Sequence, residues 1–268
     1  MNYGVSYKLY TKQVNLVLTN NLRKIVASLG EVKYRRRYGL FKAEGTKCVL
    51  DTIGAFNLKY IFATDQWLSA HPDITGVSIV KPSDLHIMSS LTTPSDVIAV
   101  FELPEYNFDT AELSRQLVIA LDGVQDPGNL GTIIRTADWF GIHTILCNYG
   151  TADAFNPKVI QSTMGAISRV KIIYLNLADF IRDKYHGEVF GTFLDGDSIF
   201  TSKLPEAGMI IMGNEGNGIS NEIMHLVNRR IHIPSFPPGA HTSESLNVAI
   251  ATAIVTAQFR AGCAFNPM

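Results

Sequence analysis

Apolar strand-like segments and helix-like segments alternate along the second half of the chain, and this alternation constrains the fold more than any other feature. Short apolar runs predict strands at residues 116–121, 144–147, 169–174, 189–194, 209–212 and 230–233. Apolar residues at helical spacing predict helices at residues 131–140, 157–164, 177–184, 220–227 and 246–259. Continuously apolar strands are typical of parallel sheets that are covered on both faces. We therefore predict an α/β domain built on a mostly parallel sheet.

A second, smaller α/β unit is predicted in the N-terminal part of the chain. A helix fits residues 21–29, and strands fit residues 60–64, 77–80 and 97–101. The stretch that follows has no sustained hydrophobic period and contains Pro104, Asn107 and Asp109, which break regular structure. The predicted division is an N-terminal domain over 1–105, a linker over 106–115 and a C-terminal domain over 116–268.

The N-terminal part is basic, although the chain as a whole is nearly neutral. The formal net charge is -1, but residues 1–49 hold ten Lys and Arg against two Asp and Glu. The densest run is Lys33-Tyr34-Arg35-Arg36-Arg37-Tyr38. A local basic patch of this kind attracts polyanions such as nucleic acid. A solvated basic helix is an equally favoured interpretation on charge alone.

The composition also bears on where the protein works. No apolar run reaches the roughly 18 residues needed to span a bilayer, and the N-terminus lacks the apolar region of a secretion signal. Cys48, Cys147 and Cys263 are few, odd in number and widely spaced, which predicts neither a disulfide framework nor a zinc site. We therefore expect a cytoplasmic protein with no membrane segment and no bound metal.

Three loops rich in glycine and asparagine carry the candidate chemistry, and the first spans residues 126–135. Gly131 allows a ligand to approach the backbone at the start of a helix, where anions bind readily. Arg135 follows one turn into that helix among apolar neighbours, so a buried guanidinium there would need an anion or a carbonyl. It is interpreted either as holding a phosphate or a reacting hydroxyl, or as a structural partner of Asp126 or Asp138.

The other two loops follow the strands predicted at 209–212 and 230–233, at the sheet edge where open α/β proteins bind ligands. The second loop lacks the G-x-G-x-x-G spacing, and no Lys-Ser/Thr follows it, which argues against a dinucleotide-dependent oxidoreductase or a P-loop protein. Its Glu215 would orient a substrate or cap the next helix. In the third loop, Ser245 or Asn247 would cap the last helix.

Taken in order, these loops resemble the three motifs of the SpoU (TrmH-type) family of RNA ribose methyltransferases, within the SPOUT superfamily. The motifs are N-x-G-x-x-x-R at 129–135, G-N-E-G-x-G-x-S at 213–220 and I-P…S-L-N-V between 233 and 248. Residues 34–45 resemble, more weakly, the small substrate-binding domain of this family, so the resemblance covers almost the whole chain. Residues 234–245 are longer than the turn usual in the family and include His241, a candidate base.

The resemblance implies a trefoil-knotted α/β fold, bound S-adenosylmethionine and a homodimer. The implied cofactor-binding residues are Gly213, Ile233 and Leu246. The implied catalytic residues are Asn129, Arg135, Glu215, Ser245 and Asn247. The implied RNA-binding residues are Lys33, Arg35, Arg36 and Arg37. Among them, Arg135 would bind the phosphate of the target nucleotide and help to activate its 2′-oxygen.

The expected reaction is methyl transfer from S-adenosylmethionine to a ribose 2′-hydroxyl of structured RNA, with ribosomal RNA favoured over transfer RNA. The donor is already activated by its positive sulfur, so no metal is required. The alternatives are a non-catalytic RNA-binding or ribosome-assembly factor on the same scaffold and a transfer-RNA ribose methyltransferase. Methylation of a base fits the motif set less well.

Overall fold

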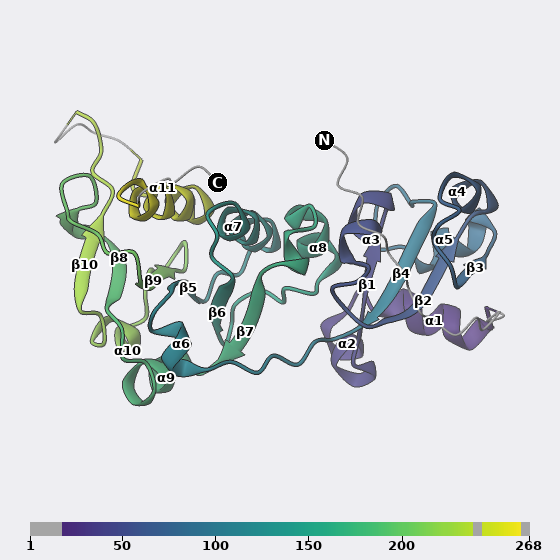
Figure 1. Cartoon of the computed structure of the whole chain (residues 1–268), viewed down its shortest axis with the longest axis horizontal. Coiled ribbons are helices and arrows are strands. Elements are labelled where there is room, and N and C mark those ends of the chain that lie inside the picture. Colours follow the sequence, from purple (N-terminus) through teal and green to yellow (C-terminus); the bar gives the residue numbers. More distant parts are fainter. Residues whose placement is uncertain (1–17, 238–242, 264–268) are drawn as a thin grey trace. The chain divides into compact units, whose positions relative to one another are not determined.

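The computed structural model describes residues 18–237 and 243–263 and divides into two compact units (Figure 1). The N-terminal unit comprises the described residues up to Glu105 together with Phe155–Ser168. The C-terminal unit comprises Tyr106–Ala154 and the described residues from Arg169 onward. His241 lies outside the described residues.

A four-stranded mixed sheet with the order β1-β4-β2-β3 forms the centre of the N-terminal unit. Its strands are β1 (Leu40–Glu44), β2 (Leu58–Ala63), β3 (Val77–Ile79) and β4 (Val97–Glu102). Strand β4 is antiparallel to β1 and β2, whereas β3 runs parallel to β2. Its helices are α1 (Asn20–Ser28), α2 (Val32–Tyr38), α3 (Thr46–Thr52), α4 (Asp65–Ala70) and α5 (Pro82–Met88). Apolar side chains of β2, β4, α1 and α5 pack together in its core, which confirms the predicted α/β unit.

Residues Phe155–Ser168 belong to the N-terminal unit although the sequence suggested that they continue the C-terminal domain. They form α8 (Pro157–Thr163) and a short 3-10 helix (Ala166–Ser168). The Phe155 ring packs against Phe41 of β1, with 4.7 Å between ring centroids. Gln161 Nε2 donates to the backbone oxygen of Glu44 at 2.5 Å. These contacts join residues more than a hundred positions apart, which hydrophobic periodicity does not register.

The C-terminal unit contains a six-stranded sheet with the order β10-β8-β9-β5-β6-β7, and every pair in it is parallel. The strands are β5 (Leu117–Asp122), β6 (Thr144–Asn148), β7 (Lys171–Leu175), β8 (Val189–Ser198), β9 (Gly208–Gly213) and β10 (Arg229–His232). The helices are α6 (Thr110–Leu113), α7 (Pro127–Trp139), α9 (Leu177–Asp183), α10 (Asn221–Met224) and α11 (Val248–Ala261). The predicted α/β class with a parallel sheet is confirmed; the trefoil knot stays a prediction.

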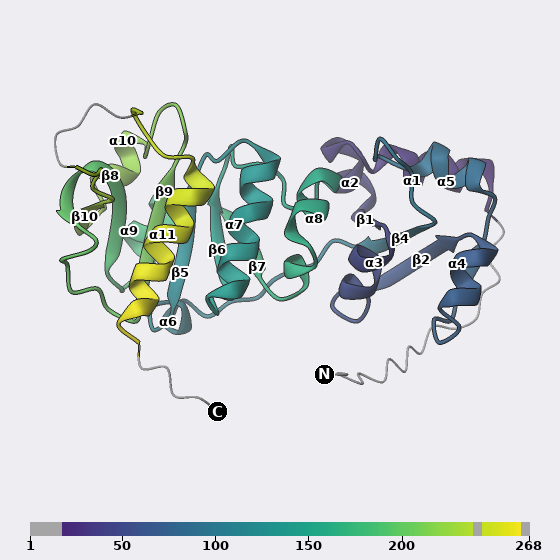
Figure 2. The ribbon, with the colours of Figure 1, turned by 90° about the horizontal axis from the view of Figure 1, so that it is seen from above.

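Helices cover both faces of this sheet, as the continuously apolar strands require. Helices α7 and α11 lie side by side on one face, while α9 and α10 lie on the other (Figures 1 and 2). All six residues of the central strand β5 are buried. Both α7 and α11 begin near the carboxyl ends of the strands, so their first turns border the candidate site.

Local sequence explains where these two helices begin. Asp126 caps α7 by accepting a hydrogen bond from Asn129 N at 2.8 Å, and Pro127 occupies the first turn, where its missing N–H costs nothing. Asn247 caps α11 by accepting from Ala249 N at 3.0 Å. The capping interpretation of Asn247 is therefore confirmed, and the same residue also has a second contact described below.

Within residues 18–237 and 243–263, no helix is both long enough and apolar enough to cross a membrane. The same described ranges contain no group of three or more His, Cys, Asp or Glu side chains placed to hold a metal ion. All three cysteines are free thiols, of which Cys48 and Cys147 are buried and Cys263 is half-buried.

Candidate active site

The three polar loops of the C-terminal unit meet at one edge of its sheet. Strand β5 ends at Asp122, β9 at Gly213 and β10 at His232. Because the strands are parallel, their carboxyl ends share this edge, where open α/β sheets bind ligands. The loops that follow them are those that carry the sequence motifs.

A chain of side-chain hydrogen bonds joins the three loops. Asn129 Nδ2 donates to Glu215 Oε1 at 2.6 Å, and Asn247 Nδ2 donates to Asn129 Oδ1 at 2.9 Å. Asn129 thus uses both ends of its amide, one for each of the other loops. Three of the five residues proposed as catalytic are in direct contact, and Asn129 is the one in the middle.

The glycine-rich loop after β9 is closed by its own asparagine. Asn214 Oδ1 accepts from Gly216 N at 2.9 Å and from Asn217 N at 3.1 Å, while its Nδ2 donates to Gly123 O at 2.8 Å. A Cβ atom on Gly213 would lie 2.3 Å from the backbone carbon of Gly218. Only glycine therefore fits at position 213, because the loop folds back directly over it.

Asp122 belongs to the candidate site, although the sequence motifs did not point to it. Its carboxylate is buried at the end of β5, where Oδ2 accepts from Ser220 N at 2.7 Å and Oδ1 accepts from Asn148 Nδ2 at 2.8 Å. It therefore ties the end of the glycine-rich loop to the sheet. The available signal was an acidic residue closing an otherwise apolar strand, since a buried carboxylate needs hydrogen-bond donors.

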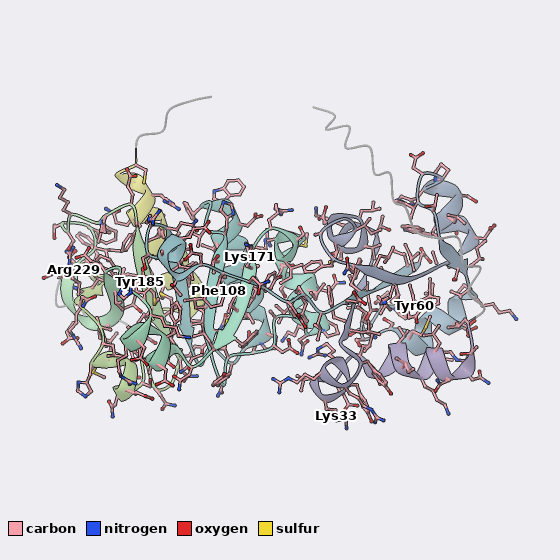
Figure 3. The ribbon with its side chains drawn as sticks, turned by 60° about the horizontal axis from the view of Figure 1, so that its bottom comes forward. Lys33, Tyr60, Phe108, Lys171, Tyr185 and Arg229 are labelled. Atoms are coloured by element: carbon pink, nitrogen blue, oxygen red, sulfur yellow. The ribbon has the colours of Figure 1, made fainter. Side chains whose placement is uncertain are left out.

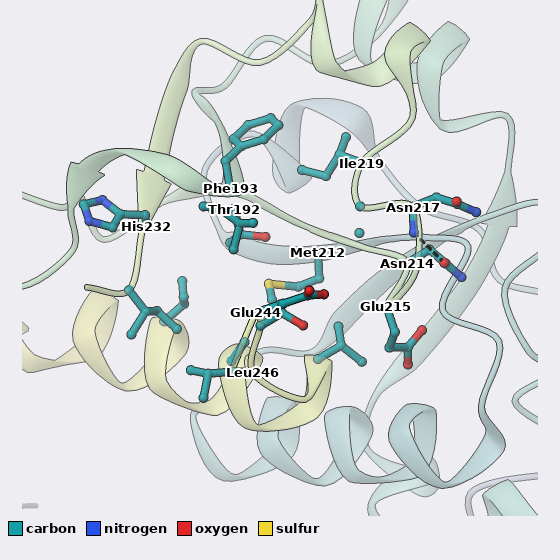
Figure 4. A pocket seen from close by; sticks show the side chains of 18 of the residues that line it. Thr192, Phe193, Met212, Asn214, Glu215, Asn217, Ile219, His232, Glu244 and Leu246 are labelled. Atoms are coloured by element: carbon teal, nitrogen blue, oxygen red, sulfur yellow. Dashed lines mark hydrogen bonds between the residues drawn. The ribbon is translucent and has the colours of Figure 1, made fainter. Parts of the chain in front are cut away.

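A cavity of about 450 Å³ opens beside the glycine-rich loop (Figure 4). Gly213, Ile233 and Leu246, the three residues proposed to bind the cofactor, all line it, as do Glu215 and Ser245. Strands β8 and β10 and helix α11 complete its mostly apolar walls. The further lining residues include Thr192, Phe193, Met212, Ile219, Ile231, Val248, Ala251 and Val255.

Arg135 is exposed on α7, and its guanidinium has no hydrogen-bond or ion-pair partner among the described residues. This corrects the expectation of a buried-type arginine. The proposed structural pairing with Asp138 is also wrong, because Asp138 accepts from Arg169 Nε at 2.9 Å and from Arg169 Nη2 at 2.7 Å. The Asp126 carboxylate caps α7 instead. Arg135 is therefore available to an external anion.

The basic run forms helix α2, and its four cations differ in exposure. Lys33, Arg36 and Arg37 are exposed, and Lys33 projects outward from the helix in Figure 3. Arg35 is 1% exposed, and its Nη1 donates to Leu29 O at 2.8 Å and to Gly30 O at 2.9 Å. Arg35 thus holds the turn between α1 and α2, in contrast to the expectation that it faces RNA phosphates.

Aromatic rings accompany the exposed cations of α2. The Tyr34 and Tyr38 rings are stacked, with centroids 6.3 Å apart and an interplanar angle of 14°. Lys33 Nζ lies 4.8 Å from the Tyr34 ring centroid, and the Arg37 guanidinium carbon lies 5.6 Å from that of Tyr38. Cations and rings at this spacing attract one another, so they form one surface.

Comparison with known proteins agrees with this geometry. Residues 116–257, which contain all three loops, match the SpoU rRNA Methylase family. The chain belongs to the SpoU rRNA methylase family. The resemblance indicated by the three sequence motifs is thereby confirmed, and the relatives below extend it to both units of the chain.

Several known proteins are similar to this chain over most of its length. The 23S rRNA (guanosine(2553)-2'-O)-methyltransferase RlmP of Bacillus subtilis is 32% identical over 235 residues, which are 85% of this chain and 91% of that protein. A TrmH-family protein from Porphyromonas gingivalis has 38% identity and a TM-score of 0.82, and the match covers 92% of this chain and 99% of that one. An AdoMet-bound rRNA methyltransferase from Sinorhizobium meliloti has 29% identity and a TM-score of 0.80. That match covers 92% of this chain and 97% of the other.

Proposed function

We propose that this protein is an S-adenosylmethionine-dependent methyltransferase that acts on a ribose 2′-hydroxyl of ribosomal RNA. The observation that carries the proposal is the contact of Asn129 with both Glu215 and Asn247 beside the cavity. Membership in the SpoU rRNA methylase family and the named activity of the Bacillus subtilis relative support the same reaction.

The lining of the cavity suits S-adenosylmethionine in polarity and in charge. Its apolar walls suit the adenosyl group, and Gly213 contributes backbone rather than side-chain atoms to its lining. The charged side chains among its described lining residues are carboxylates, which suit a positively charged sulfonium compound. Gly213, Ile233 and Leu246 would hold the cofactor, which when bound supplies an activated methyl group.

The polar cluster and Arg135 have different tasks in this reaction. A 2′-hydroxyl is a poor nucleophile that must lose its proton during attack, so in-line placement and help in removing the proton set the rate, the latter contributing about 10²–10⁴-fold. We assign Asn129, Ser245 and Asn247 to positioning the ribose and the base. Glu215 acts as a positioning residue through Asn129. The unpaired Arg135 guanidinium would bind the target phosphate and stabilise the developing negative charge on the oxygen.

Helix α2 supplies the proposed RNA-binding surface of the N-terminal unit. Lys33, Arg36 and Arg37 would contact phosphates, because exposed cations exchange bound counterions for the polyanion. The stacked pair Tyr34 and Tyr38 offers ring faces on which unpaired bases can stack. Arg35 has no direct part in this surface, since it is buried.

A homodimer through helix α11 is also part of the proposal. Ile250, Ile254 and Ala257 follow one another at helical spacing on that helix, and none of them is buried within the protein. Ile250 is 55% exposed. Apolar residues aligned on an exposed helix face favour pairing with a second copy, in which the same face meets itself across a two-fold axis. A cytoplasmic location is consistent with the three free thiols.

Methyl transfer to RNA from cells that lack this protein tests the proposal. The purified protein, labelled S-adenosylmethionine and separated ribosomal and transfer RNA are incubated, and the RNA is digested and analysed by mass spectrometry. We expect a 2′-O-methylnucleotide in ribosomal RNA with the wild type but not with Arg135→Ala, whose cofactor affinity stays unchanged. Label in transfer RNA would favour the transfer-RNA enzyme. Binding of RNA and cofactor without transfer to either RNA would favour the non-catalytic assembly factor.

A further inference from the structure

The charged side chains that line the proposed cofactor cavity are two carboxylates, those of Glu215 and Glu244. Among the described residues that line it, Glu215 and Glu244 carry formal charge, and no Lys or Arg is present (Figure 4). Glu215 Oε1 already accepts a hydrogen bond from Asn129 Nδ2 at 2.6 Å. The Glu244 carboxylate has no hydrogen-bond or ion-pair partner among the described residues. One carboxylate is therefore left available to a ligand.

Glu244 lines the cavity, on the segment that leads directly to the polar cluster. It directly precedes Ser245 and Leu246, which line the cavity, and Asn247, whose side chain contacts Asn129 at 2.9 Å. A methyl group that is delivered to the polar cluster must leave from this end of the cavity. The atom that carries the methyl group therefore has to lie near the segment that contains Glu244.

We propose that Glu244 is a specificity-determining residue whose carboxylate stabilises the positive sulfonium of the bound methyl donor. The inference rests on the proposed function and adds to it a means of distinguishing the donor from the product. Methyl transfer breaks the bond between sulfur and the methyl carbon and leaves the electron pair on sulfur. The new bond forms to the ribose 2′-oxygen, whose proton passes to solvent. The positive charge opposite Glu244 disappears in this step.

This assignment predicts that the protein binds the charged donor more tightly than the uncharged thioether product. A carboxylate interacts with a nearby cation far more strongly than with a neutral sulfur at the same distance. Glu244 is exposed to solvent, which weakens this attraction. We therefore expect the charge to contribute about tenfold in affinity. The donor and the product share the same amino-acid ammonium and carboxylate. They differ only at the sulfur, which is methylated and positively charged in the donor and neutral in the product.

Calorimetric binding measurements with full-length protein and no RNA test the assignment without relying on turnover. The proteins are the wild type, Glu244→Gln and the control Glu206→Gln, which removes the same charge from an exposed position outside the cavity. The probes are S-adenosylmethionine, S-adenosylhomocysteine and sinefungin, which carries an ammonium in place of the sulfonium. Circular dichroism and a thermal melt establish that each variant is folded, and Glu244→Asp provides a second variant that keeps the charge.

For Glu244→Gln we expect about tenfold weaker binding of S-adenosylmethionine and sinefungin, which carry a positive charge at the sulfonium position. The affinity for S-adenosylhomocysteine should fall by less than about twofold. Glu206→Gln should leave all three affinities unchanged, and Glu244→Asp should retain most of the preference. An equal loss for all three probes would overturn the assignment, because it would place the carboxylate near the shared ammonium, and so would unchanged binding. Wild-type protein with no affinity for S-adenosylmethionine would instead overturn the proposed function, and this inference with it.

Discussion

Asn129 and Glu215 are 86 residues apart in sequence, yet their side chains are joined by a hydrogen bond of 2.6 Å. Asn129 lies in the first turn of α7, and Glu215 lies in the loop after β9. Because β5 and β9 are neighbours in the parallel sheet, the loops that follow them are brought together. The bond therefore depends on the pairing of β5 with β9, and it joins two of the three loops of the site. It connects the residue proposed to position the substrate to the loop that lines the proposed cofactor cavity.

Removing either side chain of this pair should slow methyl transfer by about 10²-fold, since small misplacements of reacting groups have effects of this size. The double variant Asn129→Ala, Glu215→Ala should be little slower than either single variant, because residues that act as a unit are not additive. Values of kcat/KM for the three variants, measured with the RNA that accepts the methyl group in the transfer assay, check this. If the two effects multiply instead, Glu215 acts on the substrate independently of Asn129.

Replacing Lys33, Arg36 and Arg37 together by Ala should weaken RNA binding and flatten its dependence on salt. Each lost phosphate contact should reduce the slope of log K against log salt by about one. Filter-binding titrations over a range of salt concentrations measure the slope. The matched control replaces Lys81, Lys184 and Lys203, which are exposed elsewhere in the chain, and should leave the slope unchanged. Equal slopes for both triple variants would contradict an RNA-binding role for α2.

Arg35→Ala distinguishes the buried arginine from its exposed neighbours. Leu29 O and Gly30 O each accept a hydrogen bond from its Nη1. The substitution leaves both carbonyls unpaired, at a cost of about 1–3 kcal/mol for each buried group left unsatisfied. We expect a lower unfolding midpoint in urea, with an unchanged salt slope for the protein that stays folded. An unchanged urea midpoint together with a smaller salt slope of RNA binding would show instead that Arg35 contacts RNA.

Ile250→Glu should convert the proposed dimer into a monomer, because a charge in the centre of an apolar contact would be buried without a partner. Size-exclusion chromatography with light scattering gives the mass directly. The control is Ile79→Glu on β3, since Ile79 is 57% exposed and Ile250 is 55% exposed. The control should have the mass of the wild type. A monomeric wild-type protein would be incompatible with a dimer through α11.

Two Lys–Glu pairs in the N-terminal unit should respond differently to loss of their carboxylates. The side chains of Lys42 and Glu44 are 0% and 1% exposed with 3.3 Å between Nζ and Oε1, whereas those of Lys59 and Glu102 are 48% and 39% exposed. Burial lowers the pKa of the Lys42 ammonium, which the Glu44 carboxylate opposes. Glu44→Gln should therefore reduce the free energy of unfolding by about 3–5 kcal/mol. Glu102→Gln should cause no measurable change in urea unfolding, and equal effects would contradict this account.

Much of the fold followed from the order of residues along the chain. The apolar runs predicted the parallel strands because residues covered on both faces must all be apolar, and all six residues of β5 are indeed buried. The three loops were recognisable because glycine and asparagine are needed where a backbone turns tightly, as at Gly213. The capping role of Asn247 was also predictable, because an N-cap hydrogen bond involves only residues close in sequence.

Only the tertiary structure decided which of several similar residues does which task. Four neighbouring cations differ because Arg35 is buried against the carbonyls of Leu29 and Gly30, whereas the other three are exposed at the surface. Phe155–Ser168 joined the N-terminal unit through Phe41. Local periodicity determines which side chains avoid water, but the partner that covers or binds each one comes from a distant part of the chain. That is why the sequence determined the sheet and its loops, and the packing of distant segments decided the contacts of the site.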